Sequence, residues 1–436
     1  MKDKIHPSDV IFVKTDQSGD YLVRSGKLVR NTGIHWILAS FLICADIAGS
    51  GIVALPIAIT RLDFYAGMGF LTVVAISAVA SAIMLGESWG VRSKMRLLVT
   101  IVVNFTQFGA TTVFLLLSAT NLSGLLHAFF HIDINFCFVV LIVAGFLFPI
   151  TLLKSPQHFW QIIVGGMIST IIAMGFIVLG ASLDYKDCAP TQKLPPFKIY
   201  NVFLSFGTIL FTYGGHSAFP TIQHDMKQPA DFRKSALFAI TTVSILNMIV
   251  SSFAVMTYGD SLRDSVIGSI QTFWIQQAIS VMITAHCLMT VVLIINPLAQ
   301  TTEEFFKIPQ GFTIKRVAVR AAVMVLCVFV AETIPNFGSV LDLIGGSTVT
   351  LTSFTFPCLF YLFLSAGEKK AQEIEHIGNN DPLSFREMVQ RTKPLMLLFG
   401  GVLIFFSALL GLIATITAMQ SIVGLILKHP AISNHF

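Results

Sequence analysis

Charged residues are scarce in this chain. They make up 12% of its 436 residues, whereas an average soluble domain carries about 25%. Hydrophobic residues make up 54%, a balance that is typical of membrane proteins with several spans. The net charge of +5 is small, and the basic residues are scattered over predicted loops without forming a basic face. We therefore expect a lipid bilayer, and no nucleic acid, as the main partner of the protein surface.

Motifs for catalysis and metal binding are also lacking. The six cysteines show no metal-binding spacing, and only Cys188 falls in a clearly hydrophilic segment, so we expect no disulfide framework. The sequence contains no Gly-x-Ser-x-Gly, His-Glu-x-x-His or phosphate-binding loop. His127 and His131 have the spacing of two metal ligands on a helix, but a membrane di-iron enzyme would need several such pairs. We therefore predict no enzyme, no cofactor and no metal site.

Long apolar segments are abundant instead. Eleven of them are long and apolar enough to span a bilayer. They cover residues 35–59, 64–86, 97–119, 134–153, 161–181, 200–221, 236–258, 272–297, 317–335, 339–365 and 394–427. We therefore predict an all-α polytopic membrane protein with one transmembrane domain over residues 35–427. Residues 1–34 are predicted to form a cytosolic N-terminal tail, and residues 428–436 a short tail on the other side.

The positions of lysine and arginine predict which side of the membrane each loop faces. Of the 28 lysine and arginine residues, all but six fall in segments that share the side of the N-terminus. The six on the opposite side are Arg61, Lys186, Lys193, Lys198, Arg263 and Lys428. Because cytoplasmic loops carry an excess of positive charge, we expect the N-terminus inside and the C-terminus outside.

Two of the predicted spans contain residues that interrupt a helix. In the first span Gly51 precedes Pro56 by five residues, and in the sixth Gly215 precedes Pro220 by the same distance. Glycine and proline are both unfavourable inside a helix. A broken helix leaves backbone groups without partners, so it must be buried in protein or line a wet cavity. Paired interruptions in the two halves of a membrane protein are typical of a transporter's binding site.

The predicted topology places the two interruptions in opposite orientations. The first and sixth spans are five apart, and five is an odd number, so the two spans enter the membrane from opposite sides. Spans one to five and six to ten can then form an inverted repeat, with the eleventh as an addition. Such a repeat provides two alternating gates around one central site, as a secondary transporter requires.

The interrupted helices suit a zwitterionic ligand. The half-helix after a break begins with free N–H groups and a positive dipole end, which attract a carboxylate, and the half before it ends in free carbonyls, which attract an ammonium group. We therefore predict that the carboxylate is bound by Gly49, Ser50 and Gly51. The amine and the side chain are predicted to be bound by Tyr213, Gly214 and Gly215. The alternative is that these glycines only allow helices to pack closely.

Asp46 and His216 are candidates for proton coupling. An ionised aspartate near the centre of a membrane helix costs about 2.5–3.5 kcal/mol on insertion scales, so Asp46 should face the cavity or a partner. The pKa of a free histidine lies near physiological pH, which suits His216 to a proton relay. The alternatives are that Asp46 only caps the broken helix, and that His216 only hydrogen-bonds the broken backbone. His286, in the eighth span, is expected to form a helix–helix contact.

A polar stripe in the third span is a further candidate. Asn104, Gln107 and Thr111 lie on one helical face, because residues three and four apart are neighbours on a helix. We predict that this face, and Asn104 in particular, lines the substrate cavity. The alternative is hydrogen bonding between helices, worth about 0.6 kcal/mol per contact. Glu332 and Asp342 flank the outer turn between spans nine and ten, where we expect exposure at the membrane surface, with an outer gate as the alternative.

At both interruptions the sequence resembles the amino acid/auxin permease family, which includes proton-coupled and vesicular amino acid transporters. The resemblance rests on Ala48-Gly-Ser-Gly-Ile-Val-Ala-Leu-Pro56, on Tyr213-Gly-Gly-His-Ser-Ala-Phe-Pro-Thr-Ile-Gln223, and on Asn296-Pro297. It implies a leucine-transporter-like fold, a five-plus-five inverted repeat with broken helices 1 and 6. It also implies secondary active transport of amino acids or related amines, usually driven by protons.

Together these predictions describe a transporter that works by alternating access as a monomeric unit. We expect its substrates to be small neutral or aromatic amino acids, or related amines, and the coupling ion to be the proton. Sodium coupling is one alternative. A second is an amino acid sensor of the same fold that does not transport and signals through inner loops such as residues 367–393. The plasma membrane and an endolysosomal or vesicular membrane are equal candidates for its location.

Overall fold

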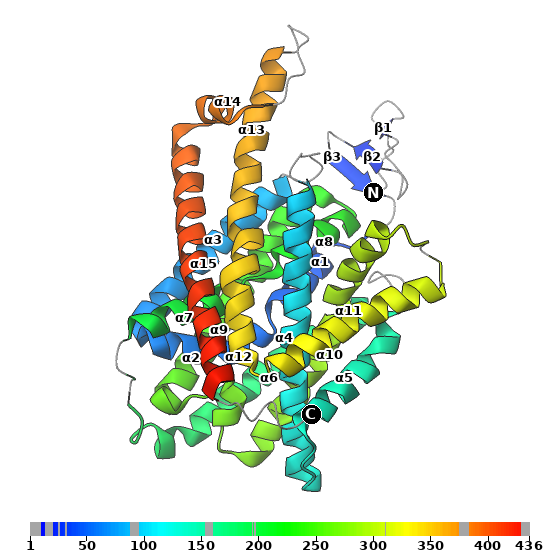
Figure 1. Cartoon of the computed structure of the whole chain (residues 1–436). Helices are drawn as coiled ribbons and strands as arrows, with labels where there is room; N and C mark the ends of the chain where they lie inside the picture. The colour runs from blue at the N-terminus through cyan, green and yellow to red at the C-terminus, as the bar shows by residue number, and fades with distance from the viewer. Residues whose placement is uncertain are drawn as a thin grey trace, which may run out of the picture.

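The fold is seen in a computed structural model of the whole chain (Figure 1). The structure describes residues 10–13, 21–24, 27–30, 33–87, 96–152, 160–193, 195, 198–309, 311–374 and 383–428. The predicted C-terminal tail after Lys428 and most of the predicted N-terminal tail therefore lie outside the described residues.

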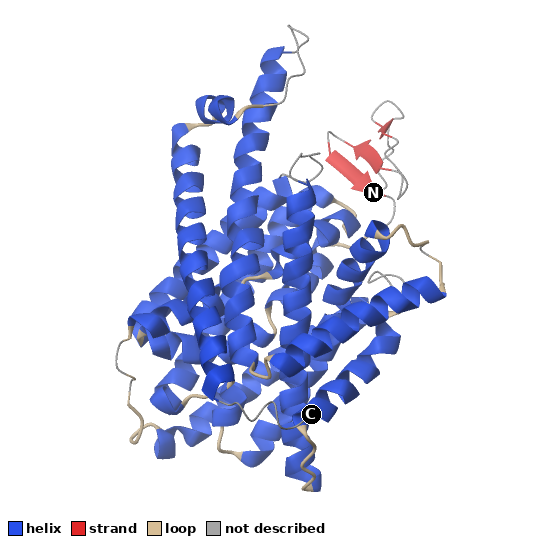
Figure 2. Ribbon diagram, in the orientation of Figure 1, coloured by secondary structure: helices blue, strands red, loops and turns tan. Residues whose placement is uncertain are grey.

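The described part of the N-terminal segment forms a small antiparallel sheet, shown in red in Figure 2. Its strands are β1 (Val10–Val13), β2 (Tyr21–Arg24) and β3 (Lys27–Arg30), in the order β1-β2-β3. Each strand contains valine with other apolar or aromatic side chains, which favour extended backbone. The sequence analysis did not predict these strands, because runs of four residues show too little alternation to indicate them.

Helices make up nearly all of the remaining described chain. In the first half they are α1 (Trp36–Ile47), α2 (Ser50–Leu62), α3 (Phe64–Glu87), α4 (Arg96–Phe130), α5 (Phe136–Thr151) and α6 (Trp160–Cys188). In the second half they are α7 (Ile199–Thr212), α8 (Phe219–Asp225), α9 (Phe232–Tyr258), α10 (Phe273–Phe305), α11 (Ile314–Thr333), α12 (Phe337–Ile344), α13 (Phe356–Ile374), α14 (Phe385–Arg391) and α15 (Pro394–Lys428). Two π-helical segments, Gly345–Val349 and Leu351–Thr355, join α12 to α13.

The predicted spans and the observed helices correspond in position, since every predicted range overlaps at least one helix. By length and composition, seven helices of the described chain are able to cross a membrane, or eight if the bent pair α1 and α2 counts as one span. With 16 residues, α5 is short for a span of about 20, and α11 begins with the basic residues Lys315 and Arg316. The number of eleven crossings and the inside position of the N-terminus stay predictions.

Both predicted helix interruptions are present. The first separates α1 from α2 at Ala48 and Gly49, and the two half-helices are bent by 56° relative to each other. The second separates α7 from α8 and contains only a short 3-10 helix, Gly215–Ser217. Pro220 lies in the first turn of α8, where its missing N–H needs no helical partner. The prediction of two broken helices is confirmed.

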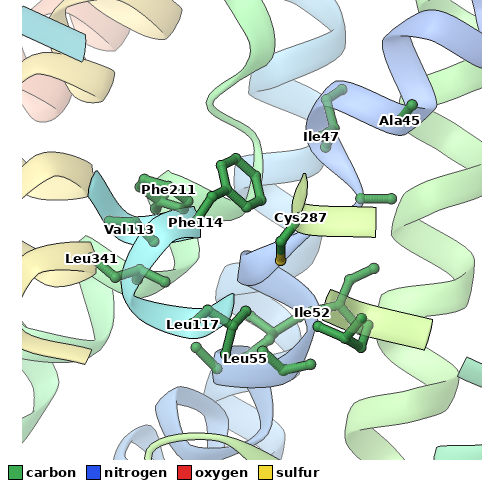
Figure 3. Close-up of a cluster of buried hydrophobic side chains, with 14 of the residues drawn as sticks. Ala45, Ile47, Ile52, Leu55, Val113, Phe114, Leu117, Phe211, Cys287 and Leu341 are labelled. Carbon is green, nitrogen blue, oxygen red and sulfur yellow. The ribbon is translucent and has the colours of Figure 1, made fainter. Parts of the chain in front are cut away.

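The half-helices pack within a bundle of longer helices. α2 packs against α7 and α1 against α9, while α10 packs against both α4 and α6. Their buried apolar side chains form one continuous cluster around the interruptions, part of which is shown in Figure 3. The two broken helices therefore lie side by side within the core of the protein.

The outer surface of the bundle is also apolar. Ile76 on α3, Phe146 on α5, Phe329 on α11 and Phe405 on α15 are each 61–65% exposed, and many similar side chains accompany them. A soluble protein rarely exposes a large contiguous apolar surface, whereas the hydrocarbon of a bilayer would cover it. This surface is that of the multi-pass membrane protein predicted from composition.

Candidate functional site

The two helix interruptions meet inside the bundle. A Cβ atom added at Gly51, in the first turn of α2, would lie 2.8 Å from the Cα atom of Thr212, the last residue of α7. A Cβ atom added at Gly215 would lie 2.6 Å from Oδ2 of Asp46 and 2.9 Å from Cγ1 of Ile47. Neither position has room for a side chain, so glycine permits the close contact between the two breaks.

A small cavity of about 30 Å³ lies between the interruptions. It is lined by residues of α1, α4, α7, α10, the second break and the first π-helical segment, namely Asp46, Ile47, Thr106, Ala110, Phe114, Phe211, Gly214, Gly215, Ser217, Ile294 and Val349. This volume suits a single water molecule and is too small for an amino acid. The structure therefore represents a closed conformation of the site.

Among the described residues that line this cavity, Asp46 is the only charged one. Its Oδ2 atom is buried and has no hydrogen-bond partner among the residues that the structure describes. Within the same residues, Asp46 forms no ion pair. A buried ionised carboxylate without a partner is strongly unfavourable. The buried Oδ2 atom of Asp46 therefore needs a partner that the described residues do not supply.

The glycines predicted to bind substrate occupy two kinds of position. Gly214 and Gly215 line the cavity. Gly49 and Gly51 lie at the first break but face neighbouring helices in this closed conformation. Ser50 begins α2, but its side chain lies outside the described part of the structure. In the closed conformation the glycines of the second break therefore line the cavity, whereas those of the first break do not.

Tyr213 and Asn104, also predicted to bind substrate, do not line the cavity. The Tyr213 hydroxyl donates a hydrogen bond of 3.0 Å to Ser244 of α9, so this ring is directed toward the surrounding bundle. On α4 the cavity is lined by residues such as Thr106 and Phe114, which lie on a different helical face from Asn104. None of the three residues of the polar stripe, Asn104, Gln107 and Thr111, is among the residues that line the cavity.

His216 lies behind the second interruption and also does not line the cavity. Its Nε2 atom is 3.0 Å from Oγ of Ser81 and 3.2 Å from the carbonyl oxygen of Ala78, both in α3. Its Nδ1 atom is 3.3 Å from the carbonyl oxygen of Tyr213. Each ring nitrogen therefore faces a backbone carbonyl oxygen, which only accepts, so either neutral tautomer donates one hydrogen bond to the backbone of α3 or of the interruption. The geometry favours the alternative in which His216 stabilises the interruption.

Phe114 and Phe211 form an apolar wall that the sequence analysis did not single out. Figure 3 shows the two side chains next to each other, Phe114 from α4 and Phe211 from α7. Both line the small cavity. The chain contains 38 phenylalanines, so the residue type alone could not have identified these two.

His286 lies directly at the first interruption. A Cβ atom added at Gly49 would lie 2.7 Å from Nε2 of His286, so the ring occupies the space beside the broken backbone. Nδ1 is 3.2 Å from the carbonyl oxygen of Gly166 in α6, and Nε2 is 3.2 Å from Oγ1 of Thr290. The sequence analysis expected a helix–helix contact for His286, and the structure shows that one partner in this contact is the broken helix.

At one end of the site, a polar cluster joins the broken helix α2 to α12. Nη2 of Arg61, near the end of α2, lies 3.4 Å from Oδ1 of Asp264. Nδ2 of Asn336, which precedes α12, donates a hydrogen bond of 3.3 Å to Oδ2 of Asp264. Asp342 in α12 accepts a hydrogen bond from Thr208 of α7 and is buried. The expectation that Asp342 is exposed at the membrane surface is wrong, because α12 packs against α7.

A larger cavity of about 680 Å³ lies beside this cluster. Its lining includes Asn121 of α4 and Arg263 and Asp264 of the segment after α9. Leu117 of α4 lines the larger cavity and Phe114 the smaller one. Three residues span less than one helical turn, so the two cavities are separated along α4 by a thin layer of apolar side chains.

At the opposite end, the chain before α1 is tied to the chain after α8. The Ile34 amide donates a hydrogen bond of 2.9 Å to the carbonyl of Asp225, and the Lys227 amide donates one of 2.8 Å to the carbonyl of Ile34. The Arg30 guanidinium donates to the carbonyl of His224. These bonds connect the start of α1 with the end of α8, which are the ends of the two half-helices that lie away from the interruptions. The site is therefore held closed at this end as well.

Comparison with known proteins gives a match over most of the chain. Residues 32–377 match a family model described as transmembrane amino acid transporter protein. Among curated proteins, the chain is similar to amino acid transporter AVT1H of Arabidopsis thaliana, with 27% identity over 204 residues. The alignment covers 45% of this chain and 47% of AVT1H, so the chain spans about half the length of that relative.

Solved structures share the fold at low sequence identity. A manganese transporter of Eremococcus coleocola aligns with a TM-score of 0.57 and 12% identity, covering 91% of this chain and 92% of that one. MhsT in complex with L-phenylalanine aligns with a TM-score of 0.53 and 13% identity, covering 87% of this chain and 98% of that one. These matches bear on the fold alone, and they confirm the predicted leucine-transporter-like arrangement of helices.

Proposed function

We propose that this chain, which belongs to the transmembrane amino acid transporter protein family, is a proton-coupled secondary transporter of amino acids or related amines. The family is one of transporters and not of enzymes. One observation carries the proposal: two interrupted helices meet at a closed cavity, and the carboxylate of Asp46 is the only charged group that the described part of the chain places in its lining.

The interrupted backbone supplies both poles that a zwitterionic substrate needs. The start of α2, at Gly49, Ser50 and Gly51, presents N–H groups and the positive end of a helix dipole to a carboxylate. The end of α7 presents carbonyl groups, and Asp46 a carboxylate, to an ammonium group. An amine without a carboxylate would still find its partner in Asp46, so amines stay within the proposed substrate class.

The apolar part of the lining favours substrates with small neutral or aromatic side chains. Phe114, Phe211 and Val349 belong to this part, and aromatic rings pack favourably against one another. Of the lining residues that the structure describes, a cationic side chain would find only Asp46 as a charged partner, and an anionic one would find none. The cavity of about 30 Å³ must expand to admit a substrate, so binding requires that one closed end of the site opens.

Asp46 provides the physical basis for proton coupling. In the closed conformation its Oδ2 atom is buried and has no partner among the described residues, so ionisation of Asp46 would leave a buried charged oxygen without compensation, which is unfavourable. A bound proton or ammonium group removes this penalty. The protein therefore passes readily through the closed conformation only when Asp46 binds a proton or an ammonium group. This requirement links ion binding to alternating access.

Uptake by proteoliposomes tests the proposal. The purified full chain is given labelled alanine, phenylalanine and a wider panel of amino acids, with and without an inward proton gradient. We expect saturable, gradient-dependent uptake of at least one small or aromatic amino acid. We also expect unchanged uptake when sodium is replaced by choline at fixed pH.

Each alternative has its own result in this assay. Dependence of uptake on sodium, in place of protons, would establish sodium coupling. Normal binding of an amino acid without net flux would support the sensor. Absence of gradient-dependent uptake across the whole panel would remove the proposed function.

A further inference from the structure

Arg263 lies in the lining of the larger cavity, whose volume is about 680 Å³. Pockets that bind small molecules usually measure about 300–1,000 Å³, so this cavity has room for an amino acid. We propose that it is a second ligand site, in which Arg263 binds the carboxylate of an amino acid. The site thereby selects amino acids over amines that lack a carboxylate. This inference rests on the transport function proposed above and narrows its substrate class.

The lining of the larger cavity contains a positive and a negative side chain that differ in their partners. Both oxygens of Asp264 are engaged, since Oδ1 lies 3.4 Å from Nη2 of Arg61 and Oδ2 accepts a hydrogen bond of 3.3 Å from Nδ2 of Asn336. Within the part of the chain that the structure describes, Arg263 forms no ion pair. A guanidinium group is always protonated, and its planar fork of donors matches the two oxygens of a carboxylate. The positive charge of this lining therefore suits a ligand with a carboxylate.

Two further polar side chains of the same lining have atoms without partners among the residues that the structure describes. Asn121 of α4 is only 6% exposed, and its Nδ2 atom is buried and unpaired. The Oγ atom of Ser265 is buried and unpaired as well. Buried polar groups without partners are unfavourable, so both atoms indicate that a ligand completes this lining. An amide nitrogen only donates and a hydroxyl donates or accepts, so the oxygens of a carboxylate suit both.

The segment that carries Arg263 is fixed against the bundle. The Arg263 amide donates a hydrogen bond of 3.0 Å to Oγ of Ser269. The 3-10 helix Val266–Ser269 follows, and its first two residues are buried. A Cβ atom added at Gly268 would lie 3.1 Å from Cδ of Arg263, so the arginine side chain crosses this glycine closely. The guanidinium group is therefore held beside the cavity before any ligand binds.

The two cavities recognise different ends of an amino acid. In the small cavity between the interruptions, Asp46 provides the charged partner for an ammonium group, and its ionised form repels a carboxylate that lacks one. In the larger cavity, Arg263 provides the charged partner for a carboxylate. Apolar surface for the side chain of the ligand comes from Leu117, Phe273 and Phe337. An amino acid therefore has a charged partner in both cavities, whereas an amine has one only in the small cavity.

Binding of three matched ligands to the purified full chain tests this assignment. Equilibrium dialysis in detergent at neutral pH measures the binding of labelled phenylalanine, of phenethylamine, which lacks the carboxylate, and of 3-phenylpropionate, which lacks the amine. We expect two molecules of phenylalanine to bind per chain. Phenethylamine should bind only in the small cavity and 3-phenylpropionate only in the larger one, so each should bind as one molecule per chain.

Substitution of the two charged residues should separate the two sites. Arg263→Gln should weaken the binding of 3-phenylpropionate by about tenfold or more and leave that of phenethylamine unchanged, because only the carboxylate loses a charged partner. Asp46→Asn should have the opposite effect. Arg263→Lys keeps the charge but not the planar fork, so it should restore part of the affinity. Lys186 is exposed at the end of α6 and is not part of the lining, so Lys186→Gln is the matched control and should bind all three ligands like the wild type.

Asn121→Leu gives a second measurement in the same cavity. The substitution removes the unpaired amide from the lining, so the affinity for 3-phenylpropionate should fall several-fold. The midpoint of thermal unfolding should stay the same or rise, because a buried polar group without a partner among the described residues is replaced by an apolar one. A lower affinity in a fully folded variant therefore reports on the ligand and not on the fold.

The possible outcomes separate this inference from the proposed function. If 3-phenylpropionate does not bind to the wild type, or binds equally well to Arg263→Gln, the second site is overturned and the proposed transport still stands. If Arg263→Gln does not yield folded protein, Asn121→Leu decides, and an unchanged affinity overturns the site. Absence of gradient-driven uptake in the wild type would instead remove the proposed function itself.

Discussion

Two carboxylates inside the helix bundle, those of Glu303 and Asp46, differ in whether the fold provides a partner for them. Oε1 of Glu303 accepts hydrogen bonds from Nε of Arg320 at 2.6 Å and from Nε of Arg316 at 3.2 Å. Oδ2 of Asp46 has no partner among the described residues. A compensated charge holds helices together, whereas an uncompensated one beside a cavity marks the place where a proton or a cationic ligand is needed.

The cluster around Glu303 joins three helices, α10, α11 and α5. Glu303 lies on α10, while Arg316 and Arg320 lie on α11. Arg320 also donates to Oδ1 of Asn296 at 2.9 Å and to the carbonyl of Thr151 at the end of α5. Removing one partner from such a buried cluster leaves a charge without compensation. Neutralising Glu303 and neutralising Asp46 should therefore have opposite consequences.

The largest effect on folding is expected for Glu303→Gln. The substitution leaves two buried guanidinium groups without their carboxylate, which costs about 3–5 kcal/mol. Thermal unfolding of the purified protein in detergent should show a strongly lowered midpoint, or no monodisperse protein at all. The neighbouring Glu304 is exposed, so Glu304→Gln is the matched control. Equal midpoints for the two variants would show that the cluster does not hold the helices together.

Asp46→Asn should have the largest effect on transport and little effect on folding. It replaces a carboxylate whose buried Oδ2 atom has no partner among the described residues, so stability should be unchanged or higher by about 1 kcal/mol. Gradient-driven uptake should fall by about tenfold or more, because the amide cannot take up a proton. The proteoliposome assay and the thermal midpoint measure the two effects. If Asp46→Asn lowers the unfolding midpoint as much as Glu303→Gln, the two carboxylates do not differ in their role in folding. If Asp46→Asn keeps full proton-driven uptake, Asp46 does not take part in proton coupling.

Gly215→Ala should obstruct the closed site by a smaller amount. The added methyl group would lie 2.6 Å from Oδ2 of Asp46 and would also contact Ile47, and overpacking of this kind costs about 1–3 kcal/mol. Because the closed conformation is the one penalised, uptake should fall several-fold. Gly175→Ala in α6 is the control, since no atom lies within 4 Å of its added Cβ. Similar uptake by both variants would argue against close contact of the two breaks.

The sequence was sufficient to locate the interruptions, but not the rotation of the helices around them. Glycine and proline both disfavour a continuous helix locally, so Gly51 and Gly215 indicated the breaks directly. The odd spacing of their spans predicted opposite orientations around one central site. The cavity face of α4 was not predictable, and it contains Phe114 where the polar stripe had suggested Asn104. Lipid and protein core are both apolar, so hydrophobicity does not orient a membrane helix.

Contacts between distant parts of the chain also lay beyond sequence reasoning. His286 meets Gly49 only because α10 packs beside the broken helix. Asp342 is buried only because α12 packs against α7. Each residue sits in an ordinary apolar helix in the sequence, and no local pattern reports its neighbour. An ionisable residue in a predicted span therefore indicates that the residue has a partner in the fold. It does not indicate which residue that partner is.

A third carboxylate, that of Glu387, extends the comparison to the exposed helix α14 and predicts the smallest effect. Glu387 accepts from the Ser384 amide at 2.8 Å and from Nζ of Lys370 at 3.0 Å. These bonds favour the ionised form and lower the pKa of Glu387 from 4.5 to about 2. Its stabilising contribution is therefore complete above pH 4.5 and is lost as the pH falls through about 2.

Hydrogen exchange over residues 385–391, corrected for intrinsic rates, should show α14 loosening in that pH window. Glu387→Gln should loosen α14 already at neutral pH and leave transport unchanged, since this carboxylate has its partners and lies outside the cavity. Transport that followed the titration of Glu387 would mean that a compensated carboxylate can also govern the cycle. In that case, the absence of a partner would no longer distinguish Asp46 from the other acidic residues.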